Sequence, residues 1–377
     1  MEKKELVKVK NLKVVFESRF DRREILRGVD FSLTTNETVG LVGINGSGKS
    51  TFAMALMGLL PKNAKIVSGS ISIDGMDMLV KSVQRGPYGR KSDDTLINKG
   101  IERLRGRFIT MVTQEVASYL DPLLDVGYQI FEPVLFHDKN RLIKRIESRD
   151  ALNNDTLSKY VKLLTAKDYS GADKFLEENF DMYVKEQILS IIRRDDLTDE
   201  DKKNLILALG KTKTSAFQKF IISNRHFTSK VPGFRRVFNK LLYDEGYKLA
   251  SEILGLMGLD TSILRMFPNQ LSGGMLQAVM VASAIINNPK VIIMDEPASS
   301  LDPIAQYRLF NLLDKIKKNF DLSLILIAHD ITLLSKFADR IVVIEDGAVV
   351  EAGDASDIIN NPSNEYTKNL IRSVIKI

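Results

Sequence analysis

The alternation of hydrophobic and polar residues predicts strands at the start of the chain. Residues 6–16 and 25–33 alternate in polarity and are rich in β-branched side chains, so we expect two strands joined by a charged turn. A helical pattern at residues 51–60 is expected to end at Pro61. The complete set of strands predicted for this part comprises residues 6–16, 25–33, 38–42, 70–74 and 108–113.

The pattern becomes helical in the middle of the chain and mixed again towards its end. Residues 123–264 have mostly helical periodicity, with polar breaks near Asn153, Gly171, Asp195 and Gly210. A hairpin is expected to turn at Asp346 and Gly347. The other elements predicted after the helical block are helices at residues 275–286 and 303–319 and strands at residues 291–294, 323–328, 340–345 and 348–351. This order predicts an α/β core with a largely helical block inserted in its middle.

Composition excludes several kinds of chemistry. The 377 residues are 44% hydrophobic and 27% charged, as in ordinary globular proteins, and they include no cysteine and three histidines. Disulfides, thiolate metal sites and cysteine nucleophiles are therefore excluded, and a multi-histidine metal site is not expected. The start, MEKKELVKVK, has no signal-peptide core, and no apolar run is long enough to span a bilayer. We expect a cytoplasmic protein that acts on a membrane only from the side.

The positive charge is concentrated in one internal segment. Residues 137–243 contain 22 Lys and Arg against 15 Asp and Glu, whereas the rest of the chain has 32 against 33. Residues 202–240 contain ten basic residues and no acidic one. This difference in composition predicts that residues 137–243 form a separate unit.

The sequence GINGSGKS at residues 43–50 has the spacing of a phosphate-binding loop. It follows an apolar strand and precedes a helix, so its backbone N–H groups can surround phosphate oxygens at a helix N-terminus. Lys49 would reach the β- and γ-phosphates, and the Ser50 hydroxyl would bind Mg²⁺. The residues expected to hold the nucleotide here are Gly43, Ile44, Asn45, Gly46, Ser47, Gly48, Lys49, Ser50 and Thr51.

An apolar strand, VIIMDE at residues 291–296, ends in two carboxylates. A buried strand that brings Asp295 beside the phosphate-binding loop would supply a further partner for Mg²⁺. Glu296 is placed to act as the general base for an attacking water. A second glycine-rich helix start, LSGGM at residues 271–275, is suited to holding another anion.

These three motifs, in their order along the chain, resemble those of the ATP-binding-cassette (ABC) ATPases. The resemblance implies a P-loop NTPase fold of the ABC type, in which a helical subdomain here carries a large, mostly helical insertion. It also implies that ATP and Mg²⁺ are the cofactors. Residues 43–50 match the family's Walker A loop, residues 271–275 its signature, and Asp295 with Glu296 the end of its Walker B strand.

The resemblance extends to the smaller motifs of the family. Gln114 matches the Q-loop glutamine, which contacts Mg²⁺ and the transporter, and His329 matches the switch histidine, which contacts the γ-phosphate. Asp302, in the run Ser300, Leu301, Asp302, resembles the D-loop aspartate. Phe16 is similar in position to the aromatic residue that stacks on adenine. A core role for Phe16, with Phe20 as the stacking residue, remains open.

Finer similarities favour the oligopeptide and dipeptide importers. QEVASYLDP at residues 114–122 resembles that branch's QDPxxSLNP, and VGYQI at residues 126–130 resembles its VGEQI. FPNQ at residues 267–270 resembles its YPHE, and NPSNEYT at residues 361–367 its NPxHPYT. The sequence departs from the branch at Leu276 and Ala278, where arginines are usual.

The signature motif implies a partner. In this family the signature of one cassette, here Ser272, Gly273 and Gly274, closes over ATP bound by the other cassette. One set of motifs therefore requires a second cassette, and the branch favours a different chain, although a homodimer remains open. Two membrane permeases and, indirectly, an extracytoplasmic substrate-binding protein are the other partners that the resemblance implies. The expected location is the cytoplasmic face of the cell membrane.

The resemblance divides the chain into four segments. We expect the N-terminal part of the ATPase core at residues 1–122, a helical subdomain at 123–270 with its insertion at about 137–243, the C-terminal part of the core at 271–350, and a short tail at 351–377.

The function of the insertion is left open by the sequence. Its second half interleaves Phe217, Phe220, Phe227, Phe234 and Phe238 with cations. It could form a small helical core with a solvated basic face, rest on anionic lipids or the permease, or bind single-stranded nucleic acid, which is the least favoured.

Three interpretations of the whole protein follow. The first is an ATP-hydrolysing subunit that drives oligopeptide or dipeptide import. The alternative is a soluble ABC ATPase that acts on ribosomes or nucleic acid through the insertion, or a module in which the insertion docks another protein. The cargo cannot be read from this chain, because selectivity in such importers lies in other subunits.

Overall fold

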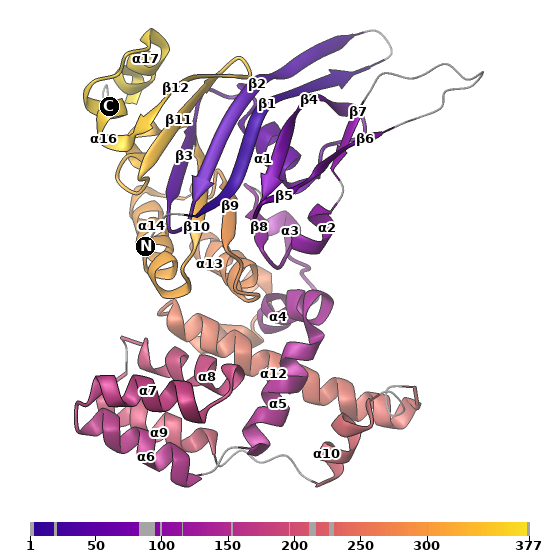
Figure 1. The fold of residues 1–377 in the computed structure, drawn as a ribbon, viewed down its shortest axis with the longest axis vertical. Coiled ribbons are helices and arrows are strands. Elements are labelled where there is room, and N and C mark those ends of the chain that lie inside the picture. Colours follow the sequence, from indigo (N-terminus) through magenta and orange to yellow (C-terminus); the bar gives the residue numbers. More distant parts are fainter. Residues whose placement is uncertain are drawn as a thin grey trace. The chain divides into compact units, whose positions relative to one another are not determined.

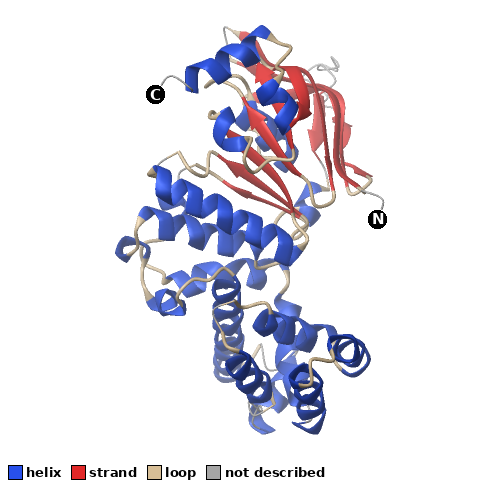
Figure 2. Ribbon diagram, turned by 90° about the vertical axis from the view of Figure 1, so that its left-hand side faces the viewer, coloured by secondary structure: helices blue, strands red, loops and turns tan. Residues whose placement is uncertain are grey.

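The structure is a computed structural model that describes residues 4–18, 21–82, 95–98, 100–114, 116–151, 154–195, 197–210, 216–225, 230–299 and 301–374. Its contacts separate two units, described here one at a time. The sheet unit consists of Met1–Val116 with Asn288–Ile377, and the helical unit of Ala117–Asn287. All strands drawn in red in Figure 2 belong to the sheet unit.

The sheet unit contains an antiparallel sheet in the order β2-β1-β4-β7-β6, with β5 paired to β4. Its longest strands lie side by side in Figure 1, and Phe16 of β1 faces Arg23 of β2 in the register. Its strands are β1 (Glu5–Glu17), β2 (Arg22–Thr34), β4 (Ala64–Ile73), β5 (Met76–Asp77), β6 (Leu79–Ser82) and β7 (Thr95–Asn98). The predicted hairpin of the first two strands is confirmed, whereas the predicted strand at residues 70–74 is only the end of a longer one.

The second sheet has the order β12-β11-β3-β10-β9-β8. All its strand pairs are parallel except β11 with β12. Its strands are β3 (Thr38–Val42), β8 (Ile109–Val112), β9 (Val291–Asp295), β10 (Ser323–Ala328), β11 (Arg340–Glu345) and β12 (Ala348–Asp354). The three central strands are buried at every residue, which explains their continuous apolar runs.

One hydrophobic core joins both sheets and the helix α1 (Lys49–Met57). Phe52 of α1 is fully buried and meets Phe31 of β2 edge to face, with 5.0 Å between the ring centroids. The helix begins at Lys49, two residues before the predicted start. It ends at Gly58, whose left-handed backbone (φ 62°) caps it, so Pro61 is not the stop signal that we predicted.

The sheet unit is completed by short helices and α14. They are α2 (Ile101–Leu104), α14 (Pro303–Phe320), α15 (Ile331–Leu334), α16 (Ala355–Asn360) and α17 (Glu365–Val374). The hairpin turn between β11 and β12 lies where it was predicted, because Asp346 and Gly347 both have positive φ.

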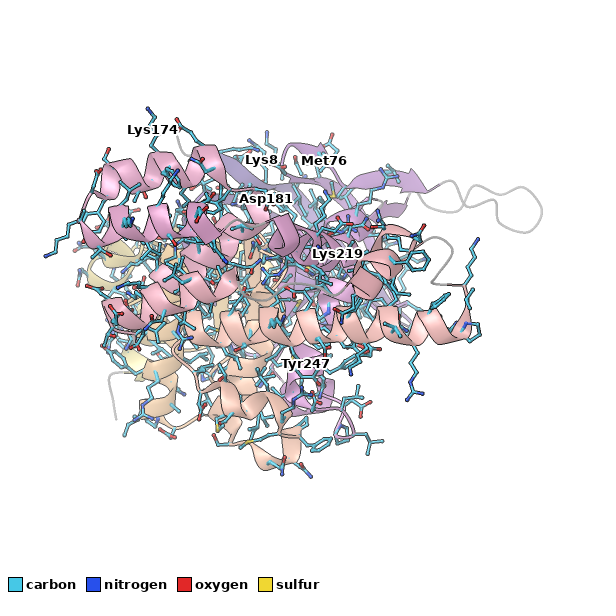
Figure 3. All side chains as sticks on the ribbon, turned by 90° about the horizontal axis from the view of Figure 1, so that it is seen from below. Lys8, Met76, Lys174, Asp181, Lys219 and Tyr247 are labelled. Atoms are coloured by element: carbon cyan, nitrogen blue, oxygen red, sulfur yellow. The ribbon has the colours of Figure 1, made fainter. Side chains whose placement is uncertain are left out.

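The helical unit has a base in which α4 (Val126–His137), α12 (Pro232–Leu256) and α13 (Gly273–Ile285) pack together. Asp125 caps α4 by accepting a hydrogen bond from the Tyr128 N–H, and it also accepts one from the Tyr247 hydroxyl at 2.6 Å. Arg265 lies 3.9 Å from the centre of the Tyr247 ring, the residue labelled on α12 in Figure 3. The 3₁₀ turn η2 (Thr261–Arg265) contacts α4 and α12, the turn η3 (Pro268–Gln270) follows it in the chain, and the one-turn helix α3 (Val116–Tyr119) begins at the last residue of the sheet unit's first segment.

Between α4 and α12 the chain forms a series of short helices. They are α5 (Lys139–Ala151), α6 (Asn154–Thr165), α7 (Tyr169–Asn179), α8 (Met182–Ile192), α9 (Asp199–Leu209) and α10 (Ala216–Ser223). Those from α6 to α9 share a hydrophobic core that includes Leu157, Tyr160, Leu176 and Ile188. The polar break predicted near Gly171 lies just before it, because Asp168 caps α7 by accepting a hydrogen bond from the Gly171 N–H.

The aromatic residues of the basic segment are only partly buried. Phe238 on α12 is buried, and the Lys139 ammonium lies 5.0 Å from the centre of its ring. Phe220 on α10 meets Phe234 on α12 edge to face, yet Phe220 remains 49% exposed. Lys219, labelled in Figure 3, is also exposed on α10. The Phe217 side chain and Phe227 lie outside the described residues.

A buried ion cluster fixes the first insertion helix to α12. Arg145 on α5 is completely buried and contacts Glu245 at 2.9 Å and Glu252 at 2.6 Å, both on α12. Arg141, one turn earlier, donates to the Ile286 carbonyl at the end of α13 and pairs with Glu186 on α8. The insertion is therefore tied to the base of the helical unit through charged side chains as well as apolar ones.

Candidate functional site

The parallel strands deliver the candidate catalytic residues to one edge of the sheet. Residue 43 follows β3, Glu296 follows β9, His329 follows β10 and Gln114 comes two residues after β8. The carboxyl ends of neighbouring parallel strands meet at the same edge, which is where α/β sheets bind their ligands. Most of the site is thus assembled by strand order alone.

The backbone of the loop between β3 and α1 requires glycine at two positions. A Cβ at residue 43 would lie 2.2 Å from the Ile344 carbonyl oxygen and 2.7 Å from the Ser47 hydroxyl. Gly48 has φ 107°, and a Cβ there would lie 2.9 Å from Leu26. The loop therefore follows a path close to neighbouring backbone that other residues cannot take.

Lys49 lies inside this loop. It is 4% exposed, and its ammonium donates to the carbonyls of Gly43 at 2.8 Å and Ile44 at 3.0 Å. Burial lowers the pKa of Lys49, and the nearby carboxylates of Glu296 and Asp295 oppose that shift. A phosphate group entering the loop would supply the anion that this buried cation lacks in its hydrogen bonds.

Asp295 is the second buried charge of the site. It is 7% exposed, it receives a hydrogen bond from Ser50, and its Oδ1 has no hydrogen-bond partner within the described part of the chain. Burial and the neighbouring charge of Glu296 raise the pKa of Asp295, against the effects of Ser50 and Lys49. A carboxylate oxygen left unpaired beside a hydroxyl suits Mg²⁺, which binds few protein oxygens and takes the rest from phosphate and water.

Glu296 adopts an unusual backbone conformation at the end of β9. Its φ is 47°, in the left-handed region that non-glycine residues seldom occupy, while its N–H donates to the Ile327 carbonyl at 2.9 Å. The Glu296 carboxylate lies 3.9 Å from Nδ1 of His329. The two side chains predicted to act on the γ-phosphate are therefore neighbours, although they are 33 residues apart in the sequence.

A cleft of about 430 Å³ opens over the loop. It contains nine residues proposed from the sequence together with Arg23 and Ile25, which sequence analysis missed. The residues that line the cleft are Phe16, Arg23, Ile25, Asn45, Gly46, Gly48, Lys49, Ser50, Thr51, Gln114 and Glu296. Because Arg23 pairs with Phe16 across the two strands, the hairpin pattern was a signal that could have suggested it.

Other predicted residues lie outside this cleft. Asp302 caps α14 by accepting hydrogen bonds from the N–H groups of Ile304 and Ala305, both at 2.9 Å. Ser272 caps α13 in the helical unit by accepting from the Met275 N–H at 3.4 Å, and Gly273 and Gly274 form its first turn. Phe20 and Ser300 lie outside the described residues.

The parallel sheet, the glycine-rich loop around Lys49 and the acidic strand end define a P-loop nucleotide-binding protein. The family model described as ABC transporter matches residues 26–299. The chain belongs to the ABC transporter family and is an ABC ATPase, as the motif order predicted.

Curated relatives align along nearly all of the chain. The metal-staphylopine import system ATP-binding protein CntD of Staphylococcus aureus is 27% identical over 99% of this chain and 94% of its own length. The oligopeptide transport ATP-binding protein AppD of Bacillus subtilis is 27% identical over 98% of this chain and 78% of its own length. OppD of Escherichia coli, also an oligopeptide transport ATP-binding protein, is 25% identical over 99% of this chain and 76% of its own length.

Solved structures share the fold. The dimeric, post-hydrolysis ATP-binding cassette MJ0796 bound to ADP and Pi aligns with a TM-score of 0.54 at 20% identity, covering 93% of this chain and 99% of its own. The cbiO1 protein of Clostridium perfringens aligns with a TM-score of 0.54 at 17% identity, covering 99% and 96%. The predicted ABC-type P-loop fold is confirmed.

Within the described residues, no helix is both long enough and apolar enough to cross a membrane.

Proposed function

We propose that this protein is the ATP-binding and ATP-hydrolysing subunit of an ABC importer that takes up oligopeptides or dipeptides. The observation that carries the proposal is the convergence of Lys49, Asp295 and Glu296 at one sheet edge, two of them lining one cleft. The relatives named for oligopeptide and dipeptide transport support the cargo class. CntD, named for metal-staphylopine import, shows that this level of similarity also includes another cargo.

ATP would bind through the loop at residues 43–50. The backbone N–H groups of the loop and the start of α1 would hold the phosphates, and Lys49 would neutralise their charge. Ser50, Asp295 and Gln114 would hold Mg²⁺, which supplies charge neutralisation at the phosphates when bound. Phe16 would stack on the adenine, with Arg23 and Ile25 beside it in the cleft.

Glu296 would act as the general base. Its carboxylate faces the cleft, and it can orient a water and accept its proton. His329, 3.9 Å away, would hold the γ-phosphate and the carboxylate in place together. In this proposal the chain supplies the groups that act on its own side of the nucleotide.

The remaining residues require a partner. Ser272, Gly273, Gly274 and Asp302 would contact the nucleotide and loop of a second ABC ATPase subunit, and this chain's nucleotide would meet the partner's signature. We propose a different chain as that partner, two membrane permeases contacted through the region of Gln114, and a substrate-binding protein outside the cell. This assembly would place the protein at the cytoplasmic face of the membrane.

In this proposal, residues 1–122 and 271–350 form the ATPase core, residues 123–270 form the helical subdomain, and residues 351–377 form a short C-terminal tail.

The insertion at about 137–243 would support this assembly from the helical subdomain. Phe238 is buried, Phe220 meets Phe234 while staying partly exposed, and the exposed cations Lys219, Arg235 and Lys240 would contact anionic lipid. Nucleic acid as the partner has no support from the relatives, which are named for transport.

The test combines assembly with transport. The tagged chain is purified from its own cells in mild detergent, and uptake of a labelled dipeptide and a labelled tetrapeptide is compared between normal cells and cells carrying only the Lys49→Ala variant. Co-purification of two polytopic permeases and a second cassette, with uptake lost in the variant, is the expected result. Recovery of ribosomal proteins or RNA without permeases would overturn the importer. Unchanged uptake of both peptides with permeases present would overturn the cargo only.

A further inference from the structure

The C-terminal helix α17 reaches the phosphate-binding loop through one side chain. The hydroxyl of Tyr366, in the first turn of α17, accepts a hydrogen bond from the backbone N–H of Ile44 at 2.9 Å. Ile44 is the second residue of the loop, and its own side chain is 53% exposed. The contact joins residues that are 322 positions apart in the sequence.

The position of Tyr366 is set by hydrogen bonds from the strand β12. Glu351 on this strand accepts from the N–H and the hydroxyl of Ser363, at 2.7 and 2.6 Å, and from the N–H of Asn364 at 3.2 Å. The Asn364 side chain in turn accepts from the Tyr366 N–H at 2.8 Å. The turn that leads into α17 is therefore fixed to the sheet, and Tyr366 follows directly after it.

A second C-terminal contact holds the other side of the same loop. The N–H of Gly347, in the turn between β11 and β12, donates to the Ser47 carbonyl at 3.0 Å, and its carbonyl accepts from the Arg27 N–H at 2.8 Å. The loop is thus held at Ile44 by a side chain and at Ser47 by backbone. Of the two contacts, only the one at Ile44 can be removed by a side-chain substitution.

A phosphate-binding loop works by presenting several N–H groups in a fixed arrangement, and any freedom it has before binding must be lost when the nucleotide enters. The Tyr366 hydroxyl accepts the hydrogen bond from the Ile44 N–H, so this N–H group has a partner before any ligand binds. The loop is thereby held open around Lys49. Burial raises the pKa of Tyr366, the hydrogen bond from the Ile44 N–H opposes this shift, and the charges of Glu345 and Asp346 add to it, so the hydroxyl keeps its proton across the neutral range.

We propose that Tyr366 is a positioning residue for the nucleotide, which pre-orders the phosphate-binding loop through the Ile44 N–H and makes the C-terminal helix part of the ATP site. This role rests on the proposed ATP site at residues 43–50. It concerns affinity rather than the hydrolytic step, because Tyr366 is not among the residues that line the cleft.

The test removes only the hydroxyl. Tyr366→Phe keeps the ring, so α17 stays packed, and the full-length protein is compared with wild type for binding of a fluorescent ATP analogue with Mg²⁺ and for steady-state ATP hydrolysis. Loss of one hydrogen bond to the loop predicts a roughly fivefold weaker ATP affinity and higher KM, with kcat changed less than about twofold. Tyr307→Phe, on the exposed face of α14, is the matched control and should behave as wild type.

Each outcome decides between roles. Tyr366→Phe equal to wild type in affinity and KM would overturn the proposal, and a defect only in Tyr366→Ala would show that the ring packs and nothing more. A fall in kcat at constant KM would also overturn it, because the loop would then be acting in the reaction and not in binding. If the wild-type protein itself binds no ATP while remaining folded, the proposed function fails, and this role fails with it.

Discussion

One buried charge cluster in the helical unit and one in the sheet unit have different kinds of partners. In the helical unit the buried guanidinium of Arg145 meets two carboxylates, and that of Arg141 meets Glu186 and a carbonyl. In the sheet unit the buried Lys49 ammonium donates to the carbonyls of Gly43 and Ile44, and one oxygen of buried Asp295 has no hydrogen-bond partner among the described residues.

The difference separates structural charge from functional charge. A buried ion whose charge is neutralised by carboxylates stabilises one arrangement of the chain and presents no net charge to a ligand, even though Nη1 of Arg145 has no hydrogen-bond partner among the described residues. A buried cation and a buried carboxylate that lie near each other without full sets of partners carry a desolvation cost. A ligand that brings both an anion and a cation can offset this cost when it binds. A nucleoside triphosphate with Mg²⁺ is such a ligand. The paired charges of Arg145 and Arg141 therefore have a structural role, whereas the charges of Lys49 and Asp295 are those of a binding site.

The largest effect should come from removing the proposed base. Glu296→Gln keeps the shape of the side chain but cannot accept a proton, so hydrolysis should slow about a hundredfold or more while ATP binding persists. Phosphate release and binding of a fluorescent ATP analogue would be measured in parallel. Glu102→Gln, an exposed residue of α2, is the control, and near-normal turnover of Glu296→Gln would remove Glu296 from its role.

The structural role of the buried ion cluster can be tested at Arg145. Arg145→Met removes the guanidinium that contacts buried Glu245 at 2.9 Å and leaves that carboxylate with the half-exposed Lys248, 3.9 Å away, which should destabilise the helical unit by about 3–5 kcal/mol. Urea unfolding followed by circular dichroism would measure this loss. Arg225→Met, which removes an exposed pair with Glu147, should change stability by less than about 1 kcal/mol. Equal effects of the two substitutions would contradict the structural role of the buried cluster.

The unpaired side can be tested at Asp295. Because burial raises its pKa, folding disfavours the ionised form, and the resulting destabilisation is present at pH values above the raised pKa and disappears as the pH falls through it. Asp295→Asn should therefore stabilise the nucleotide-free protein by about 1 kcal/mol at pH 8, and less at lower pH. The same variant should lose the stabilisation that Mg²⁺ with ATP gives to wild type.

Thermal unfolding with and without Mg²⁺ and ATP measures both effects of Asp295→Asn. Asp314→Asn, whose partner Lys318 lies on the same exposed helix surface, is the matched control. A destabilised Asp295→Asn protein without nucleotide would show that the carboxylate has a structural partner after all.

The smallest effect is expected at Glu351, which holds the turn before α17. Its pKa is lowered because the hydrogen bonds from Ser363 and the following backbone outweigh the effect of burial. Glu351→Gln replaces one of the two accepting oxygens by an amide N–H₂, so one of the backbone N–H groups of Ser363 and Asn364 loses its acceptor, and the KM for ATP should rise about twofold through Tyr366. Glu365→Gln, an exposed residue of α17, should leave KM unchanged. A larger rise in KM in Glu351→Gln than in Tyr366→Phe would contradict the view that Glu351 acts through Tyr366.

The local elements that position the site could be predicted because each depends on a short run of residues. The apolar runs at residues 38–42 and 291–294 are strands, and the spacing of Gly43, Gly48 and Lys49 is that of a loop with close backbone contacts. The end of α1 was misplaced because the helix stops at a left-handed glycine before Pro61 can act. The strands β6 and β7 were missed, since they are short and have no strong alternation.

The sequence by itself determined the family, the motifs and the residue types that ATP chemistry requires, because the spacing of a glycine-rich loop and an acidic strand end is a local property. Only the tertiary structure decided which distant residues join them. Parallel strand order brought His329 to Glu296, strand register brought Arg23 beside Phe16, and packing of α17 brought Tyr366 to Ile44. These contacts arise from pairing and packing between segments far apart in the chain, for which no short sequence pattern is a sufficient cause.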